Sequence, residues 1–470
     1  MSVVRPELSN VQGILEHRFV QPHSAIMLFS LGETAGAKRF LARWKDRMPS
    51  ADMAPTDFKA PLVSFGFTWR GLTTLLENET TLSPEAGKAQ LDLGFTQMTP
   101  DHPGMSDQLG FIGSSSPEFW WDKQFTNAEI HLAIFVWCDS GSQMEETLSS
   151  IRVDANECGV VELKLNAFAN ATLSGERPEG GVLHFGYRDG ITSPYIDWSD
   201  TKVTGSVDFR EFVMGYPSEY YRVPPTTPGP WRDLAMDGTF ACVAWIHQDV
   251  AAFNRYLADH TDLGQGHTPA GLEQEWLAAK MMGRWRDGSP VGRHPNAPPS
   301  VPDYENKFDF SDDPHGVGCP LTAHIRVVNP RSDELTFPNT SRFRAGPPRF
   351  IRRGFSYGAK LEGTQDDGAE RGLVGIFLCA RINEQFYTAL RWINKTGFSE
   401  ALHSKPYNEW MQDALFGSRS KPKADPRLII PDASAGVTEA ALPNFITYRG
   451  VCNFLLPSMS SLRILTSQQQ

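Results

Sequence analysis

No stretch of about 18 consecutive apolar residues occurs in the 470 residues of the chain, so the sequence predicts no membrane-spanning helix. The N-terminal segment MSVVRPELSNVQG has neither the basic start nor the apolar run of a signal peptide. These two absences predict a cytoplasmic protein without a membrane partner, and they leave export without a recognisable signal open.

Cysteine is scarce, and the six cysteines are widely separated in sequence. Cys138 ends the apolar run IHLAIFVWC, and Cys379 ends GIFLC. Scattered cysteines in apolar surroundings are typical of buried thiols in a reducing compartment, not of a disulfide framework. The predicted free thiols are Cys138, Cys158, Cys242, Cys319, Cys379 and Cys452.

An excess of positive charge is also missing, since 44 Lys and Arg stand against 55 Asp and Glu, a formal net charge of −11. Nucleic acids and anionic membranes attract basic surfaces, so neither is an expected partner. The sequence contains no G-x-x-x-x-G-K-[ST], H-E-x-x-H or G-x-S-x-G. It therefore indicates no nucleotide, zinc-protease or serine-hydrolase site.

The apolar patterns that are present alternate between strand-like and helix-like runs. In the first half they predict strand, helix, strand twice in succession, which is the ferredoxin-like plan. The runs are strands at 25–31, 129–138 and 160–173, a strand leading into a short helix over 61–76, and helices at 36–48 and 145–158. Residues 77–125 show no strong periodicity and are predicted to be a long surface excursion.

A proline-rich run at 224–230 is the best linker and divides the chain into predicted domains 1–223 and 224–470. The second domain is expected to contain a strand and helix over 237–260, a helix over 272–285 ending at Gly283, a strand and helix over 370–394, and a closing strand pair over 444–462 with a kink near Gly450. Ile376, Leu378 and Ala380 share one face of a predicted strand, so they could wall a cavity. These patterns predict an α+β fold.

The segment 312–331, DDPHGVGCPLTAHIRVVNPR, places His324 in an apolar setting with arginines nearby in sequence. The run is too short for periodicity to decide between helix and strand. Such a histidine suits an axial ligand of haem iron, with Arg326 or Arg331 available for a propionate. Two alternatives are a histidine satisfied within the core, and a zinc site of His315, Cys319 and His324, for which no fourth ligand is apparent.

Two further places carry candidate polar residues. In the segment GGVLHFGYRDGITSPYI (180–196), an apolar strand is expected to lead into a turn, where Gly186 and Gly190 allow positive φ and a close approach of the backbone to a ligand. Asp189 lies at the tip of that turn, where a simple turn residue is the alternative. In PRFIRRGFSYG, Arg352 and Arg353 precede a glycine, and a solvated strand edge is the alternative for both.

The segment around His324 resembles the proximal-histidine signature of the dye-decolorising peroxidases, haem proteins of the ferredoxin-like dimeric α+β barrel superfamily. CP, AHIR and NPR carry this resemblance in one uninterrupted piece. FG-x-x-DG followed by I-x-x-P resembles the distal aspartate motif, and RG-x-x-YG places Arg352 at the distal arginine. A shift of the alignment by one residue would exchange Arg352 with Arg353.

The resemblance implies two ferredoxin-like domains, each an antiparallel sheet with helices packed on it. It implies haem b on His324, Asp189 as acid/base and Arg352 as charge stabiliser. Gly190, Arg326 and Arg331 are the expected cofactor-binding residues. A carboxylate should bond the outer nitrogen of His324, and the sequence leaves open whether it is Asp309, Asp312, Asp313 or a remote residue.

The implied activity is reduction of hydrogen peroxide with oxidation of bulky aromatic or phenolic reductants such as dyes, with an optimum at acidic pH. Tyr357 and, less strongly, Trp392 are candidate surface sites for electron transfer from dyes too large for the haem pocket. A homodimer is the candidate assembly. The alternative is a haem-binding protein for storage or sensing without turnover, although such a protein would need neither Asp189 nor Arg352.

Overall fold

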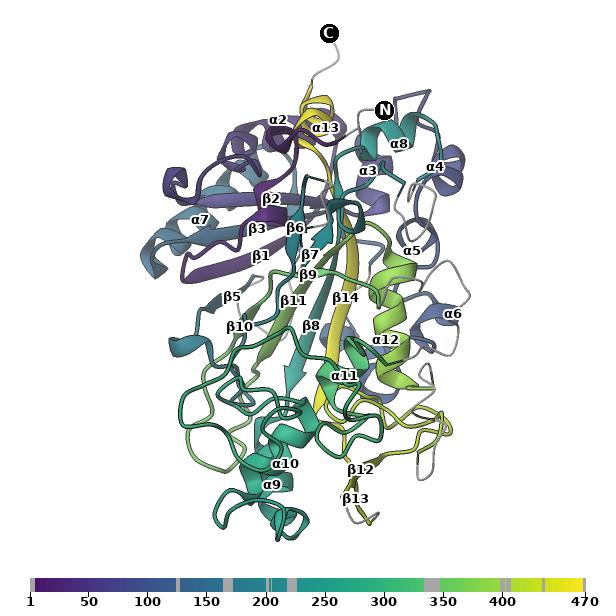
Figure 1. Cartoon of the computed structure of the whole chain (residues 1–470). Coiled ribbons are helices and arrows are strands. Elements are labelled where there is room, and N and C mark those ends of the chain that lie inside the picture. Colours follow the sequence, from purple (N-terminus) through teal and green to yellow (C-terminus); the bar gives the residue numbers. More distant parts are fainter. Residues whose placement is uncertain are drawn as a thin grey trace.

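The computed structural model of the chain describes residues 5–123, 127–163, 172–199, 203, 205–217, 226–333, 347–397, 402, 407–432 and 436–467. Its centre is a ten-stranded sheet in the order β10-β11-β8-β14-β2-β3-β1-β4, with β5 also paired to β1 and β9 to β11. Figure 1 shows the strands of the first half in purple and blue, next to those of the second half in teal, green and yellow.

The first half supplies five strands, all paired antiparallel. They are β1 (His23–Ser30), β2 (Leu62–Phe67), β3 (Leu132–Cys138), β4 (Val161–Glu162) and β5 (Leu173–Glu176). The helices among them are α1 (Gly13–Glu16), α2 (Thr34–Trp44), α3 (Trp69–Leu75) and α7 (Gly141–Glu157). The predicted order of strands and helices is confirmed, while residues 164–171 of the strand expected at 160–173 lie outside the described residues.

The second half contributes β8 (Thr239–Gln248), β9 (Ile351–Arg352), β10 (Phe355–Tyr357), β11 (Gly372–Cys379) and β14 (Ile446–Leu456). Its helices are α8 (Pro230–Ala235), α9 (Val250–Asp259), α10 (Glu273–Met282), α11 (His324–Val328), α12 (Tyr387–Asn394) and α13 (Met459–Thr466). Helix α10 ends at Gly283 with φ +91°, as the sequence predicted. The expected closing strand pair is instead the single strand β14, whose register shifts between Tyr448 and Gly450.

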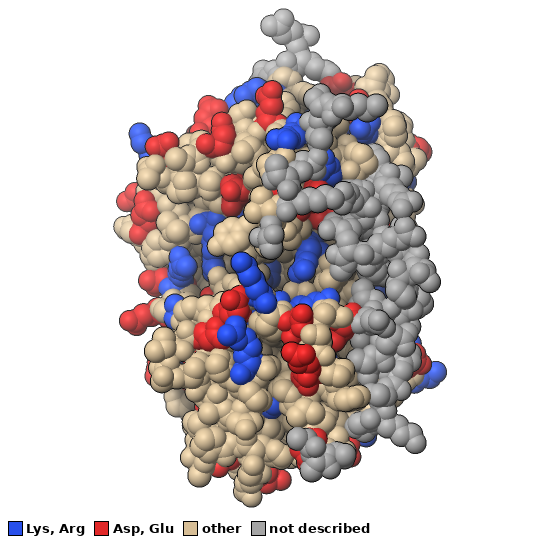
Figure 2. All heavy atoms as spheres, viewed as in Figure 1, with Lys and Arg blue, Asp and Glu red and all other residues tan. Residues whose placement is uncertain are grey.

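Two smaller sheets lie outside the central one. Strands β6 (Tyr195–Asp197) and β7 (Ser206–Asp208) form a parallel pair, and β12 (Arg427–Pro431) pairs antiparallel with β13 (Val437–Ala441). On the face drawn in Figure 2, basic side chains gather across the middle of the molecule, and acidic side chains lie directly below them. Charged side chains also lie along the upper part and the left edge of this face, so its surface charge is mixed.

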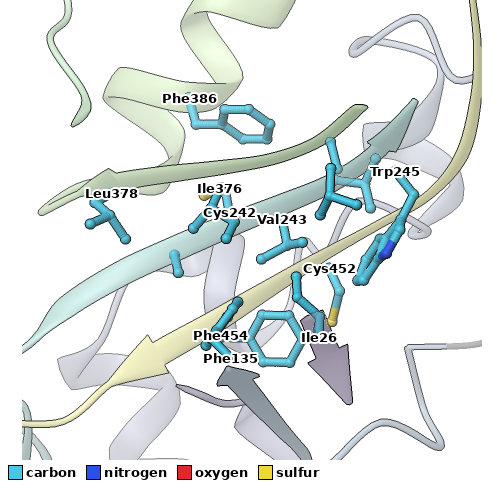
Figure 3. Packing of buried hydrophobic residues seen from close by; sticks show 14 of the residues in the cluster. Ile26, Phe135, Cys242, Val243, Trp245, Ile376, Leu378, Phe386, Cys452 and Phe454 are labelled. Carbon is cyan, nitrogen blue, oxygen red and sulfur yellow. The ribbon is translucent and has the colours of Figure 1, made fainter. Parts of the chain in front are cut away.

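The two halves share one sheet and one core. Strand β14 pairs with β2 through Leu455 and Phe67, which joins the two sets of strands edge to edge. Figure 3 shows Ile26 and Phe135 of the first half close to Cys452 and Phe454 of β14. The α+β class with antiparallel sheets is confirmed, whereas the boundary expected at 223/224 lies outside the described residues and stays a prediction.

Residues 77–123 do not form the predicted surface excursion. They contain the short helices α4 (Pro84–Gln90), α5 (Leu93–Thr96) and α6 (Pro103–Ser106). Phe95, Leu109 and Trp120 are buried in the core. Sequence periodicity could not detect these elements because helices of four to seven residues are too short to repeat an apolar pattern.

Two further local expectations are wrong. The apolar run at 182–185 is not a strand of the central sheet; it leads into a turn closed by a hydrogen bond from the Leu183 amide to the Tyr187 carbonyl. Ile376, Leu378 and Ala380 do not wall a cavity, because all three are fully buried in the core. Figure 3 shows Ile376 and Leu378 among the residues of that core.

All six cysteines are buried and free, as predicted. Within the described ranges, none of the helices is both long and apolar enough to cross a bilayer.

Candidate active site

His324 is the first residue of helix α11, which settles the choice between helix and strand. Its Nδ1 atom lies 2.8 Å from Oδ2 of Asp413, whose side chain is fully buried. The other carboxylate oxygen of Asp413 accepts the backbone N–H groups of Leu415 and Phe416. A buried carboxylate held in this way makes Nδ1 the protonated ring nitrogen.

The second ring nitrogen of His324, Nε2, has no hydrogen-bond partner among the described residues. The ring lies beside that of Phe416, with centroids 4.6 Å apart, and a fifth of the side chain remains exposed. With Nδ1 protonated, Nε2 presents an unshared lone pair, which is the donor that a haem iron needs. A histidine fully satisfied within the core would not leave this nitrogen open.

The carboxylate behind His324 is therefore a remote one. Asp413 is 89 residues away in sequence, and nothing in the segment MQDALFG marks it out. The nearer candidates have other roles: Asp313 accepts the amides of Gly318 and Cys319, and Asp309 accepts Ser311.

The alternative zinc site is not formed. Among the residues that the structure describes, no group of three His, Cys, Asp or Glu side chains could hold a metal ion. Burial also raises the pKa of the Cys319 thiol to about 12, which opposes the thiolate that zinc requires.

Asp189 and Arg352, predicted from separate motifs, lie together. Nη2 of Arg352 is 3.6 Å from Oδ1 of Asp189 and donates to the Thr192 hydroxyl at 2.9 Å. Arg352 lies on β9 opposite Phe377 of β11, and paired residues of antiparallel strands point to the same face. That face of β11 is only half-buried, in contrast to the core face with Ile376.

The charges around Asp189 favour its ionised form. Burial alone would raise the pKa of the Asp189 carboxyl, but Arg352, the Gly190 amide, Arg18 and Arg177 together lower it below its ordinary value. Asp189 is therefore suited to act as an anionic proton acceptor under acidic conditions.

Arg353 has a different role from Arg352. Its guanidinium donates to the carbonyl oxygens of Ile14, Leu15 and Glu16 at the end of α1. These carbonyls are among those that a helix leaves unpaired at its C-terminus, so Arg353 caps α1. Of the two neighbouring arginines, only Arg352 has an ion pair with Asp189.

Gly190 was expected to let the backbone approach a ligand, and the structure places a side chain there instead. Gly190 has φ +84°, and a Cβ atom at this position would collide with Nη1 of Arg18. The space that glycine leaves open is filled by the Arg18 guanidinium. Sequence inspection missed Arg18 because no motif includes it.

A cluster of arginines contains the expected propionate ligand Arg331. The pKa of Arg331 is lowered to about 10 by burial and then by Arg349, and the pKa of Arg284 is lowered to about 10 by burial and then by Arg331. Nε of Arg331 and Nε of Arg284 have no hydrogen-bond partner among the described residues. Buried cations with unused donors fit an anionic ligand such as the two propionates of haem.

Arg326, the other residue proposed for a propionate, is not available. All five of its N–H groups are used: they bond both carboxylate oxygens of Asp333, a carboxylate oxygen and the carbonyl of Asp313, and the Cys319 carbonyl. Its side chain is 1% exposed. Arg326 instead fixes the loop that leads into α11.

Neither candidate aromatic lies at the surface. Tyr357 is 1% exposed, and its hydroxyl donates to Glu370 at 3.1 Å. Trp392 is 7% exposed on α12. The expectation of direct contact between a large dye and either ring is therefore wrong, because both rings are buried.

Comparison with known proteins places this site in context. The sequence matches no protein-family model. It is 27% identical to the dye-decolorizing peroxidase AauDyP1 of Auricularia auricula-judae over 375 residues, 76% of this chain and 69% of that protein. It is 26% identical to Peroxidase 2 of Mycetinis scorodonius over 429 residues, 85% of this chain and 75% of that protein.

Solved structures show the same fold. A dye-decolorizing peroxidase in complex with 2,6-dimethoxyphenol superposes with a TM-score of 0.76 at 23% identity, covering 98% of this chain and 99% of that chain. An ancestral D-type dye-decolorizing peroxidase superposes with a TM-score of 0.78 at 23% identity, covering 99% of this chain and 100% of that chain. These structures show that the chain has the fold of the dye-decolorizing peroxidases, and its sequence is similar to curated peroxidases of that kind.

Proposed function

We propose that this protein is a haem b peroxidase that reduces hydrogen peroxide and oxidises bulky aromatic or phenolic compounds. The observation that carries the proposal is the ion pair between Asp189 and Arg352, which supplies a proton acceptor and a fixed cation together. A haem-binding protein for storage or sensing would need the His324 site alone.

His324 would bind the haem iron through Nε2, and Asp413 would hold the proton on Nδ1. This arrangement fixes the ring and increases its electron donation. Arg331 and Arg284 would pair with the propionates. Bound in this way, haem supplies the redox chemistry that breaks the O–O bond with electrons from the reductant.

Peroxide would meet Asp189 and Arg352. Reduction of hydrogen peroxide to two molecules of water consumes two protons and two electrons, and the electrons come from two one-electron oxidations of the reductant. The ionised Asp189 accepts a proton from one peroxide oxygen and returns it to the oxygen that leaves as water. The Arg352 guanidinium stabilises the negative charge that develops as the bond breaks.

The reductants we propose are phenols and dyes. One similar solved structure contains 2,6-dimethoxyphenol. A curated relative of this chain is named a dye-decolorizing peroxidase. Because Tyr357 and Trp392 are buried, electrons from a bulky dye must enter through other groups.

The test is peroxide-dependent oxidation of 2,6-dimethoxyphenol by the haem-loaded protein, with Asp189→Asn and Arg352→Gln compared against the exposed-site control Arg463→Gln. We expect turnover in the wild type and the control, and a loss of about 10²-fold or more in the site variants. Haem binding without turnover in the wild type would support the storage or sensing alternative instead.

A further inference from the structure

We propose that Arg18 is a positioning residue for Asp189: it pairs with the carboxylate oxygen that Arg352 does not pair with, and so holds the carboxylate in the orientation that meets peroxide. This inference rests on the proposed function and extends it to a residue outside all three motifs.

The first support is that the two carboxylate oxygens of Asp189 pair with two different arginines. Nη2 of Arg18 is 3.5 Å from Oδ2, whereas Nη2 of Arg352 is 3.6 Å from Oδ1. Each guanidinium thus pairs with a different oxygen. Two separate charge contacts restrict rotation of the carboxylate more than a single contact does, so losing Arg18 would free one oxygen.

The second support is the fit between Arg18 and the turn that carries Asp189. The guanidinium occupies the space beside Gly190 that any Cβ atom would fill, since a Cβ atom there would collide with Nη1 of Arg18. Gly190 also has φ +84°, a conformation that glycine adopts without strain. The turn therefore accommodates both the sharp bend and the Arg18 head group.

The third support is the anchoring of the chain around Arg18. The His17 ring bonds the Ala51 carbonyl at 3.1 Å, and Phe19 is buried against Trp137. Arg353 bonds the carbonyls of α1 just before this segment. Arg353, which follows Arg352 in sequence, therefore holds the segment that carries Arg18. Both arginines that pair with Asp189 are in this way linked to the backbone at the end of α1.

The fourth support is the cavity on the Arg18 side. Arg18 and Asp189 line a cavity of about 60 Å³, together with Arg177 and the buried Ser356, whose hydroxyl has no partner among the described residues. This volume holds on the order of four water molecules. Arg18 and Asp189 therefore face the same cavity, which is large enough for water.

The charged groups facing Asp189 are Arg352 on β9, Arg18 after α1 and Arg177 after β5, and the Gly190 amide also donates to it. All of these lower the pKa of the carboxyl, and their effects decrease in the order Arg352, Gly190, Arg18 and Arg177. Removing Arg18 should therefore raise the pKa of Asp189, by less than removing Arg352 and by more than removing Arg177.

The test compares Arg18→Gln, Arg18→Lys and Arg177→Gln with the wild type. The first readout is a pH titration of the Asp189 carboxyl carbon by NMR in haem-free protein, with its signal assigned by the loss in Asp189→Asn. We expect an upward shift of the midpoint in Arg18→Gln, a smaller one in Arg177→Gln, and recovery in Arg18→Lys. An unchanged midpoint in Arg18→Gln would overturn the inference.

The second readout is the pH profile of kcat/KM for peroxide in the haem-loaded protein. For Arg18→Gln we expect the acid limb to move to higher pH, with a loss of about threefold or more below the midpoint and recovery in Arg18→Lys. An equal loss at every pH would indicate a merely structural role and contradict the inference. A wild type without turnover would overturn the proposed function, while the NMR titration would still decide the role of Arg18.

Discussion

The Nδ1 atom of His324 bonds a carboxylate oxygen of Asp413 at 2.8 Å, and this contact joins the start of α11 to a buried turn 89 residues later. Asp413 is itself held by two backbone amides, so it cannot rotate away from the ring. The pair fixes both the direction of His324 and the nitrogen that carries its proton. The orientation of the proposed axial ligand therefore depends on a residue far from it in sequence.

Replacing Asp413 tests this dependence. Asp413→Asn preserves the shape of the side chain but offers Nδ1 a neutral acceptor. We expect a higher reduction potential of the bound haem and a rate with peroxide about 10- to 100-fold lower, because His324 donates less electron density. Potentiometric titration and stopped-flow kinetics measure the two effects. Wild-type values for both would show that Asp413 does not tune the ligand.

Arg331 and Arg326 form a matched pair of variants. Arg331→Gln removes a cation with an unused donor, so haem affinity should fall on the order of tenfold. It also removes the bonds from Nη1 to the Asn306 and Phe308 carbonyls, which should cost about 1–3 kcal/mol of stability. Arg326→Leu leaves Asp333 buried without its partner, so it should cost about 3–5 kcal/mol of stability. Haem titration and urea unfolding separate the two. The reverse pattern would return Arg326 to the cofactor site.

Activity should persist into acidic solution and then fall. Asp189 acts as a base only when it is ionised, and the pKa of its carboxyl lies below the ordinary value. Peroxidase activity should therefore be retained above that lowered pKa and lost as the pH falls through it. In Arg352→Gln the acid limb should move to higher pH because the largest neighbouring charge is gone. A wild-type rate that shows no acid limb down to about pH 2, with the protein still folded, would count against Asp189 as the base.

Glu370 should make stability depend on pH. His247 and Arg449 lower the pKa of the Glu370 carboxyl from 4.5 to about 2, although burial opposes them. The ionised group therefore stabilises the fold above about pH 4.5, and this contribution is lost as the pH falls towards 2. Glu370→Gln should lose roughly 1 kcal/mol at neutral pH and progressively less towards pH 2. Urea midpoints across this range, with the exposed control Glu362→Gln, measure it; a loss independent of pH would contradict the assignment.

Tyr357→Phe should leave the turnover of large dyes unchanged. The ring is buried, and Glu370 keeps its bonds to His247 and Arg449 when the hydroxyl is removed. Steady-state rates with a bulky dye and with 2,6-dimethoxyphenol provide the comparison. A selective loss with the dye would restore Tyr357 to the electron path.

The sequence could identify residues that short motifs carry, but not their partners across the fold. His324, Asp189 and Arg352 each stand in a contiguous pattern, and the structure brings Asp189 and Arg352 together. Asp413 and Arg18 belong to no such pattern. Asp413 contacts His324 and Arg18 contacts Asp189, and both contacts join segments that are far apart in the chain.

Burial was equally hard to predict for residues outside regular elements. Trp120 lies in a stretch without apolar periodicity, yet it is fully buried because short helices and turns fold it into the core. The sequence indicated that Arg326 could bind a haem propionate, whereas in the structure its guanidinium forms ion pairs with Asp333 and Asp313. By contrast, the long strands and helices, such as β8 and α7, were predictable because their length lets periodicity accumulate.

Titration of the purified protein with haemin, followed by its Soret band, tests the role of His324 most directly. We predict one saturable site in the wild type, and in His324→Ala a weaker site whose spectrum returns towards that of the wild type when imidazole is added. Identical titrations and spectra for the wild type and His324→Ala, with no response to imidazole, would contradict the account.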